Sequence, residues 1–213
     1  MKREKLKGQT PVISYLLVLG VLLSTVSVAY LWGVPLLKKG SVNSKISDAQ
    51  QTMLQMNNAL ENVISNGGES STTFVSYGRV KITKQDNSVY YVLRTEKTPY
   101  ATNVWIPLTT DNTFSVPGTE EANSKAILGI NTPSLVLVRA EPIGNGEFLI
   151  IFRLALRNLI DQEGNIYKYE LIPQGTTSVE NGQHKITFRK GTVKKTLENG
   201  TVVYTIPIYA TLS

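Results

Sequence analysis

Residue types that carry catalytic chemistry are scarce in this chain of 213 residues. It has no cysteine and a single histidine, His184, beside 16 Asp and Glu and 22 Lys and Arg. Without cysteine there is no disulfide, thiol nucleophile, iron–sulfur cluster or thiolate zinc site, and a Ser-His-Asp enzyme would depend on His184 alone. The sequence has no phosphate-binding loop or HExxH pattern. The scattered carboxylates leave glycoside hydrolysis open, but we expect no enzyme, no metal and no cofactor.

Two polar motifs permit binding or modification. Asp161-Gln162-Glu163-Gly164-Asn165 places oxygen ligands at alternate positions, as a calcium loop can, but it also suits a hairpin turn, which we favour. Asn199-Gly200-Thr201 is the single N-x-[ST] match, so Asn199 is a candidate glycosylation site. A tight Asn-Gly turn explains the same residues equally well.

The net charge of +6 is unevenly distributed. The first eight residues, MKREKLKG, contribute +3 of it, and what is left does not describe a strongly basic body. A second basic cluster lies near the C-terminus, where its residues alternate with Ile186 and Phe188. This alternation is typical of a strand whose charged face is solvated. The alternative is that the cluster contacts acidic glycans, nucleic acid or a partner subunit. Its members are His184, Lys185, Arg189, Lys190, Lys194 and Lys195. No aromatic ladder interleaves them, so we expect no nucleic-acid partner.

A long apolar segment follows the basic N-terminus. Pro11–Leu37 is a run of 27 residues without a charged side chain. About 20 such residues span a hydrocarbon core of roughly 30 Å, so this segment is expected to start in a membrane. It is too long for an ordinary secretory signal, and Ala29-Tyr30-Leu31 is not a signal-peptidase site. The basic residues before the span place the N-terminus in the cytoplasm.

The basic residues come before the apolar segment, and this order favours cleavage of the chain just before the apolar helix. Lys7-Gly8 ends a short basic leader, and Gln9-Thr10-Pro11-Val12-Ile13 opens the apolar segment, which ends near Trp32. This N-terminus resembles that of archaeal type IV pilins, with Thr10 where that family usually has Ser. It lacks the Glu of bacterial pilins, whose position is Ile13, and its Pro-Val-Ile start favours pilins over archaellins.

The resemblance implies a processing site at Lys7, Gly8 and Gln9, with a prepilin peptidase cutting between Gly8 and Gln9. It also implies an assembly ATPase, a membrane platform and polymerisation of the chain with itself through the helix. The resulting filament would lie outside the cell and serve adhesion.

Small and aromatic residues within the span suit either a helix bundle or a lone membrane helix. Gly20 with Ser24, and Ala29 with Gly33, form small-xxx-small pairs that let helices pack closely. Ser24, Thr25 and Ser27 can bond to backbone carbonyls. Tyr15, Tyr30 and Trp32 serve as interfacial anchors in a membrane or as packing residues in a filament core.

A second helical pattern follows the apolar run. Gly33-Val34-Pro35 is expected to kink or interrupt the helix. An apolar stripe then recurs every three or four residues, with polar side chains on the other faces, until Asn66-Gly67-Gly68 ends it. The stripe consists of Ile46, Ala49, Met53, Met56, Leu60 and Val63. It can pack on the chain's own β region, which we favour, or on helices of neighbouring subunits.

From about Thr72 the apolar period becomes two, which predicts about ten strands. The expected strands are Phe74–Lys84, Ser88–Glu96, Asn103–Leu108, Ala126–Ile130, Ser134–Ala140, Phe148–Arg157, Asn165–Ile172, His184–Lys190, Thr192–Leu197 and Thr201–Thr211. Asn145-Gly146, Asn181-Gly182 and Asn199-Gly200 stand between such runs as expected hairpin turns. Strands joined by hairpins indicate an antiparallel sandwich or barrel, of which we favour the sandwich.

The sequence therefore predicts an α+β protein in three parts. Residues 1–8 form a leader, residues 9–66 form the membrane or filament-core helix with its amphipathic extension, and residues 70–213 form an extracellular, all-β antiparallel sandwich of the immunoglobulin-like or a related type. Two functions fit this organisation. The favoured one is the pilus subunit; the alternative is a signal-anchored binding module that does not polymerise.

Overall fold

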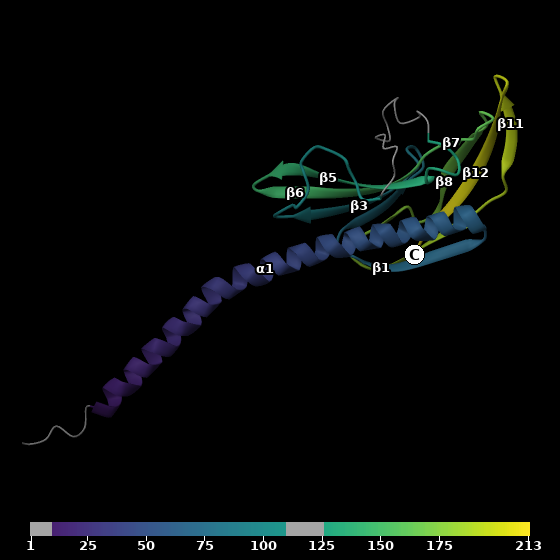
Figure 1. Cartoon of the computed structure of the whole chain (residues 1–213). Coiled ribbons are helices and arrows are strands. Elements are labelled where there is room, and N and C mark those ends of the chain that lie inside the picture. The colour runs from purple at the N-terminus through teal and green to yellow at the C-terminus, as the bar shows by residue number, and fades with distance from the viewer. Residues whose placement is uncertain (1–9, 110–125) are drawn as a thin grey trace, which may run out of the picture. The chain divides into compact units, whose positions relative to one another are not determined.

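The structure, a computed structural model, describes residues 10–109 and 126–213, and only the backbone of residues 10–13 and 35–39. One helix, α1 (Thr10–Asn66), precedes twelve described strands (Figure 1). The chain divides into two compact units, Met1–Ser44 and Lys45–Ser213. The N-terminal helix followed by a mostly β C-terminal region confirms the α+β class.

The first unit is helical throughout its described part. The helix continues through Gly33-Val34-Pro35, so the expectation of an interruption there is wrong. A proline removes one hydrogen bond from a helix, and the bonds of the turns on either side are enough to keep the backbone helical.

In the second unit the apolar stripe of α1 is buried. All six of its residues are at most 4% exposed, and Met53 and Met56 are completely buried. The stripe packs on the chain's own β region, since Tyr100 donates to Gln50 (2.9 Å) and Thr72 donates to the Gln55 carbonyl (3.5 Å). Figure 1 shows this part of α1 between β1 and the strands β3, β5 and β6.

The helix ends at the expected glycines. Gly67 and Gly68 both have φ of 74°, and the Gly67 N–H donates to the Val63 carbonyl at 2.9 Å, the pattern of a left-handed C-cap. The Lys190 ammonium donates to the Ile64 carbonyl at 2.6 Å, which satisfies another carbonyl of the last turn.

The strands form two six-stranded sheets. Sheet A contains β1 (Glu69–Ser76), β10 (Gly182–Lys190), β12 (Thr201–Leu212), β8 (Ile166–Gly175) and β7 (Leu159–Ile160) in that order, with β11 (Lys194–Glu198) also paired to β12. Sheet B contains β4 (Ile106–Pro107), β5 (Ser134–Gly144), β6 (Glu147–Leu156), β3 (Ser88–Thr95), β2 (Arg79–Thr83) and β9 (Ser178–Val179) in that order.

The pairing is antiparallel apart from β8 and β12, which run parallel along ten residue pairs. The purely antiparallel sheet expected from the sequence is therefore wrong at this pair. The connection from β8 to β12 passes through β9 in sheet B and then returns to sheet A by β10, so these strands are not joined by a hairpin.

Asn87 links the two sheets. It has φ of 49° in the turn before β3, and its side-chain amide donates to the Tyr169 carbonyl (3.2 Å) and accepts from the Leu171 N–H (3.1 Å) of β8. Sheet B carries a fully buried face, whose members include Val80, Tyr91, Val136, Val138, Ile150, Phe152 and Leu154.

Two of the three Asn-Gly turns are confirmed. Asn145 and Asn199 have φ of 53° and 49°, and each connects two paired strands. Asn181-Gly182 is not a hairpin, since the strand before it, β9, belongs to sheet B and Gly182 begins β10 of sheet A. Only its glycine has a positive φ, of 134°.

Three expected strands are wrong in extent. Asn103–Leu108 is reduced to the two residues of β4, and Asn103 has a φ of 60° that no strand allows. Phe74–Lys84 is not one strand, because the chain leaves sheet A at Ser76 and enters sheet B at Arg79. Gly78 occupies this crossing, where a Cβ would lie 2.1 Å from the Val92 carbonyl oxygen. Residues 126–130 form only an isolated bridge, since Asn131 folds back to accept from the Ile127 N–H at 2.7 Å.

Candidate functional site

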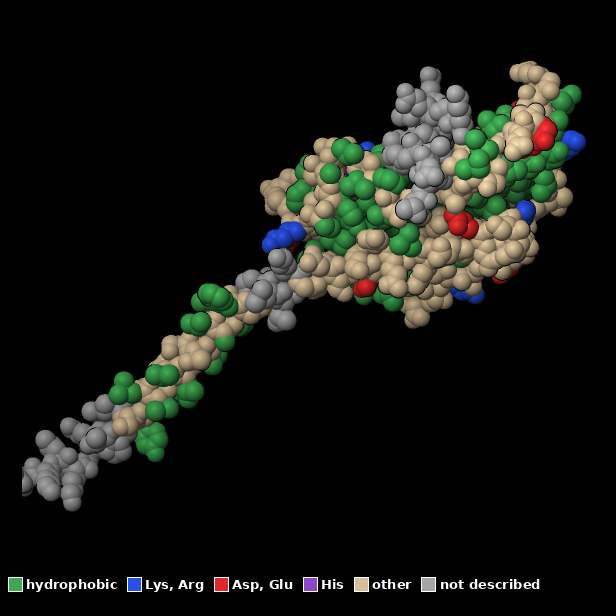
Figure 2. All heavy atoms as spheres, in the orientation of Figure 1, with side chains coloured by type: hydrophobic (Ala, Val, Ile, Leu, Met, Phe, Trp, Pro, Cys, Tyr) green, Lys and Arg blue, Asp and Glu red, His purple; other side chains and the backbone are tan. Residues whose placement is uncertain are grey.

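The candidate site is the apolar surface of the first unit, Ser14–Val34. Among the described residues, this segment of α1 is the single helical stretch that is both long enough and apolar enough to cross a membrane. Every side chain from Ser14 to Trp32 is exposed, and thirteen of them are large and apolar (Figure 2). Burying such a side chain gains roughly 1.5–3 kcal/mol, so leaving thirteen in water costs on the order of 20 kcal/mol. Transfer into lipid or into a protein interface would recover this free energy, so the segment is suited to either environment.

Three hydroxyl groups of this helix are satisfied within it. Thr25 and Ser24 both donate to the Val21 carbonyl, at 2.7 and 2.8 Å, and Ser27 donates to the Leu23 carbonyl at 2.7 Å. Such bonds to the preceding turn remove the cost of placing a hydroxyl in an apolar environment. These three polar residues are therefore compatible with lipid.

The two small-residue pairs lie on different faces of the helix. Gly20 and Ser24, like Ala29 and Gly33, are four residues apart and share a face. Nine residues separate Gly20 from Ala29, which at about 100° per residue places the two pairs on roughly opposite faces. A Cβ at Gly20 or Gly33 would meet no atom within 4 Å, so nothing in the first unit fills these positions.

The predicted processing residues Lys7, Gly8 and Gln9 lie outside the described residues. The aromatic residues at the two ends of the span are described, and their side chains are exposed: Tyr15, Tyr30 and Trp32. Their positions near the ends of Ser14–Val34 fit interfacial anchors and bundle packing equally well.

Among the described residues that could carry catalytic chemistry, the single histidine, His184, lies on β10 and is partly exposed. His184 contacts the Glu180 carbonyl through its Nε2 and the Phe74 ring, with centroids 5.9 Å apart. Among these residues no group of three His, Cys, Asp or Glu side chains is positioned to hold a metal.

The acidic motif forms a turn between β7 and β8. The Asp161 carboxylate accepts from the backbone N–H and the side-chain amide of Asn165, both at 2.8 Å, and Gly164 has φ of 83°. Partial desolvation raises the pKa of Asp161, but hydrogen bonds from Asn165 and Glu163 outweigh it and lower that pKa overall. Both carboxylate oxygens of Asp161 are therefore engaged by the turn itself.

The C-terminal cations are largely on the surface. Lys185, Lys194 and Lys195 are exposed, and Arg189 is exposed with its guanidinium 5.5 Å from the Tyr209 ring. Lys190 differs, because it caps the helix. Asn199 is exposed at the tip of the β11–β12 hairpin, where a glycan could be attached without displacing any packed side chain.

The structure contains one buried polar cluster that the sequence did not predict. Ser134, at the start of β5, donates its hydroxyl to Asn57 (2.8 Å) and lies 3.2 Å from Glu61, which accepts from the Asn57 amide at 3.1 Å. Asn57 is 3% exposed. The i, i+4 spacing of Asn57 and Glu61 signals a helix pair, but nothing in the sequence indicates that Ser134 joins them.

Comparison with known proteins assigns the chain to a family. It belongs to a family of unknown function, DUF7289, which matches residues 7–116, just over half of the chain. The match covers α1 and the first strands. No curated protein and no solved structure is significantly similar.

Proposed function

We propose that this chain is the precursor of a structural subunit of an archaeal type IV pilus-like filament on the cell surface. A prepilin peptidase cuts it between Gly8 and Gln9, and a membrane platform with its ATPase adds the subunit to a growing filament. The helix forms the filament core, and the β region faces outward and serves adhesion.

The exposed apolar surface of Ser14–Val34 is the observation that carries the proposal. Lipid and a bundle of like helices are equally apolar, so transfer between them requires close packing rather than hydrophobic gain. Small-residue pairs on two roughly opposite faces suit a bundle in which each helix has neighbours on both sides. A lone membrane anchor needs neither pair.

The positive charge of residues 1–8 supports the proposed cleavage. These residues carry half of the net charge of +6, directly in front of the apolar helix. Four basic side chains anchor the precursor at the cytoplasmic surface, and removing them leaves the α-amino group of Gln9 as the single charge before the apolar helix, which can then leave the membrane.

Blocking the cleavage tests the processing step. Gly8→Leu places a bulky side chain where the peptidase must bind a small residue, and it should leave the leader attached and abolish filaments. Lys5→Arg keeps the charge and serves as the matched control. The readouts are N-terminal peptide mass spectrometry and electron microscopy of sheared cell-surface material. Normal maturation of the Gly8→Leu variant would contradict the proposal.

Widening the helix tests the packing step separately. Gly20→Leu should be processed and inserted normally, because a side chain there meets nothing within the subunit, but it should prevent close packing and filament growth. Val21→Leu adds bulk at the next position, off the small face, and should leave filaments intact. Normal filaments from Gly20→Leu would remove the packing role of this pair.

A further inference from the structure

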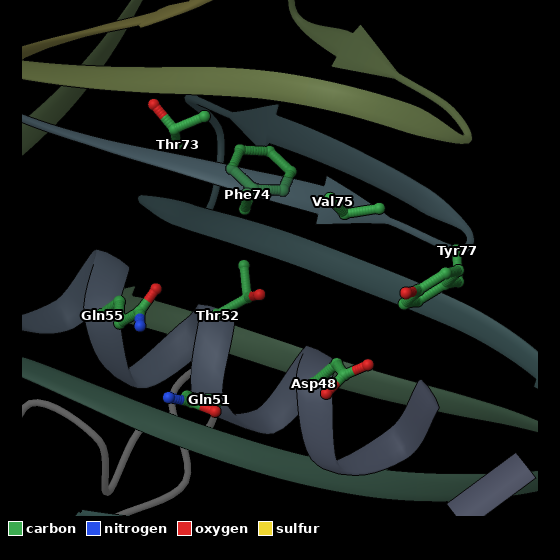
Figure 3. Close-up of a pocket in the computed structure, with 8 residues that line it drawn as sticks. All are labelled: Asp48, Gln51, Thr52, Gln55, Thr73, Phe74, Val75 and Tyr77. Atoms are coloured by element: carbon green, nitrogen blue, oxygen red, sulfur yellow. The ribbon is translucent and has the colours of Figure 1, made fainter. Parts of the chain in front are cut away.

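A polar cleft lies between the buried part of α1 and β1. Its volume of about 290 Å³ is close to the lower end of the range for ligand pockets, roughly 300–1,000 Å³. Figure 3 shows its two sides, with the helix side chains across from those of the strand. The helix contributes Asp48, Gln51, Thr52 and Gln55, and Phe74 and Tyr77 lie on the strand side.

Thr52 carries a buried hydroxyl that the protein itself does not use. The residue is 6% exposed and lines the cleft, on the side of the helix that faces Phe74 (Figure 3). A threonine in a helix can donate to the carbonyl of the preceding turn, as Thr25 does, but Thr52 makes no hydrogen bond to another described residue. A buried polar group without a partner costs free energy, which a ligand that bonds to this hydroxyl would recover.

The polar groups around Thr52 are also available. The carboxylate of Asp48 and the side-chain amides of Gln51 and Gln55 make no hydrogen bond to other described residues. An adjoining hollow of about 380 Å³ shares Gln55 and continues along the helix. The residues that line this second hollow carry amides or hydroxyls, apart from one alanine. The two hollows together therefore offer a row of hydrogen-bonding groups that is almost entirely neutral.

These groups suit a neutral saccharide. A sugar hydroxyl both donates and accepts, so it can bond to a carboxylate, an amide or a threonine hydroxyl. The Tyr77 ring is 41% exposed and offers a surface for the C–H face of a sugar ring. Of the described residues that line the first hollow, Asp48 alone is charged, which disfavours an anionic ligand. The Lys45 ammonium lies 5.8 Å from the centre of the Tyr77 ring and disfavours a cationic one.

We propose that this cleft binds a neutral saccharide of the surface to which the filament adheres. The inference rests on the proposed function, because it names the ligand class of that adhesion. The binding itself needs only the second unit, since every residue that lines the cleft lies within Lys45–Ser213. It can therefore be measured without filaments.

A glycan array tests the ligand class. The full-length precursor, in micelles of a detergent without a sugar headgroup, is applied to an array and detected with an antibody. The array carries neutral hexose and N-acetylhexosamine oligosaccharides beside sialylated and sulfated ones. The protein should bind neutral glycans and leave the acidic ones empty. Binding to no neutral glycan, or to acidic glycans alone, would overturn the inference.

Two variants test the cleft itself, by titration with the neutral glycan that binds best on the array. Thr52→Val keeps the shape of the side chain and removes its hydroxyl, so it should weaken binding about 2- to 10-fold. Asp48→Asn removes the charge and should weaken binding about tenfold. Thr211→Val and Glu69→Gln are the matched controls outside both hollows, and they should bind normally. Unchanged binding in both cleft variants would contradict the assignment.

Urea unfolding without saccharide separates a binding role of Thr52 from a structural one. Because its hydroxyl has no partner in the described protein, Thr52→Val should leave the free energy of unfolding unchanged or raise it. A hydroxyl that held the fold together would give the opposite result. A loss of stability in Thr52→Val would therefore count against the ligand-binding role.

The outcomes distinguish this inference from the proposed function. Filaments on cells, together with a cleft that binds no neutral glycan, would remove the inference and leave the pilus subunit standing. Saccharide binding by a chain that never forms filaments would contradict the proposed function. The cleft would then be the ligand site of a membrane-anchored module.

Discussion

Leu60 tests whether the second part of α1 belongs to the β region of its own subunit. Its side chain is 1% exposed, so Leu60→Ala removes three buried carbon atoms and leaves a cavity. Substitutions of this kind cost about 2–5 kcal/mol, and alanine's high helix propensity adds no penalty. We expect a loss of about 3 kcal/mol, a large part of the 5–15 kcal/mol that typically stabilises a domain.

The assay is urea unfolding of the unpolymerised precursor in detergent micelles. Trp105 is half-buried, and the Arg139 guanidinium lies 4.6 Å from its ring, so its fluorescence should report unfolding of sheet B. A Trp32→Phe background removes the signal of the apolar helix. Asn58→Ala is the matched control, because Asn58 is exposed two residues away; it should change the free energy of unfolding by no more than about 0.5 kcal/mol.

The alternative gives a different result. If the stripe served helices of neighbouring subunits, Leu60 would be exposed in the monomer, and Leu60→Ala would behave like Asn58→Ala. A difference below about 0.5 kcal/mol between these variants would refute the packing described here.

Three further predictions concern polar groups and the helix cap. Ser134→Ala should cost about 1–3 kcal/mol in urea unfolding, because it leaves Asn57 and Glu61 with an unmade hydrogen bond, and an unchanged midpoint would contradict the cluster. Desolvation, followed by the hydrogen bond to Asp86, raises the pKa of Tyr90 to about 12, from 10.0. The contribution of Tyr90 to the free energy of unfolding is therefore complete below about pH 10 and should be lost as the pH rises towards about 12. In a titration followed by tyrosinate absorbance, Tyr90→Phe should remove the last step. Gly67→Ala should cost about 1 kcal/mol because φ is 74°, whereas Gly40→Ala in the helix interior should stabilise by up to about 1 kcal/mol; equal effects would refute the left-handed cap.

The elements most predictable from the sequence are those fixed by local chemistry. The burial of Met53 and Met56 follows from their spacing, and the helix end at Gly67 follows from glycine's tolerance of positive φ. The hairpin turns at Asn145 and Asn199 have the same local origin.

Long-range contacts explain what sequence reasoning missed. Asn181-Gly182 has the composition of a hairpin turn, but its flanking strands pair with β2 and β1 in different sheets. The parallel pairing of β8 with β12 joins residues 37 positions apart, such as Ile166 and Val203, and no local pattern encodes it. The break at Gly78 depends on how closely Val92 approaches, which only the folded chain determines.

The functional residues also divide into those that the sequence reveals and those that only the folded chain reveals. The apolar surface of Ser14–Val34 and its small residues are readable because membrane segments have a simple composition. The cluster of Ser134 with Asn57 and Glu61 is not readable, because Ser134 is more than 70 residues from them in the sequence and reaches them only in the folded chain.

N-terminal peptide mass spectrometry of the protein from the native cell envelope tests the central claim most directly. A pilus subunit must begin at Gln9, with residues 1–8 removed and the apolar helix retained. A chain that still begins within Met1–Lys7 would contradict this account and make a signal-anchored binding module the better description.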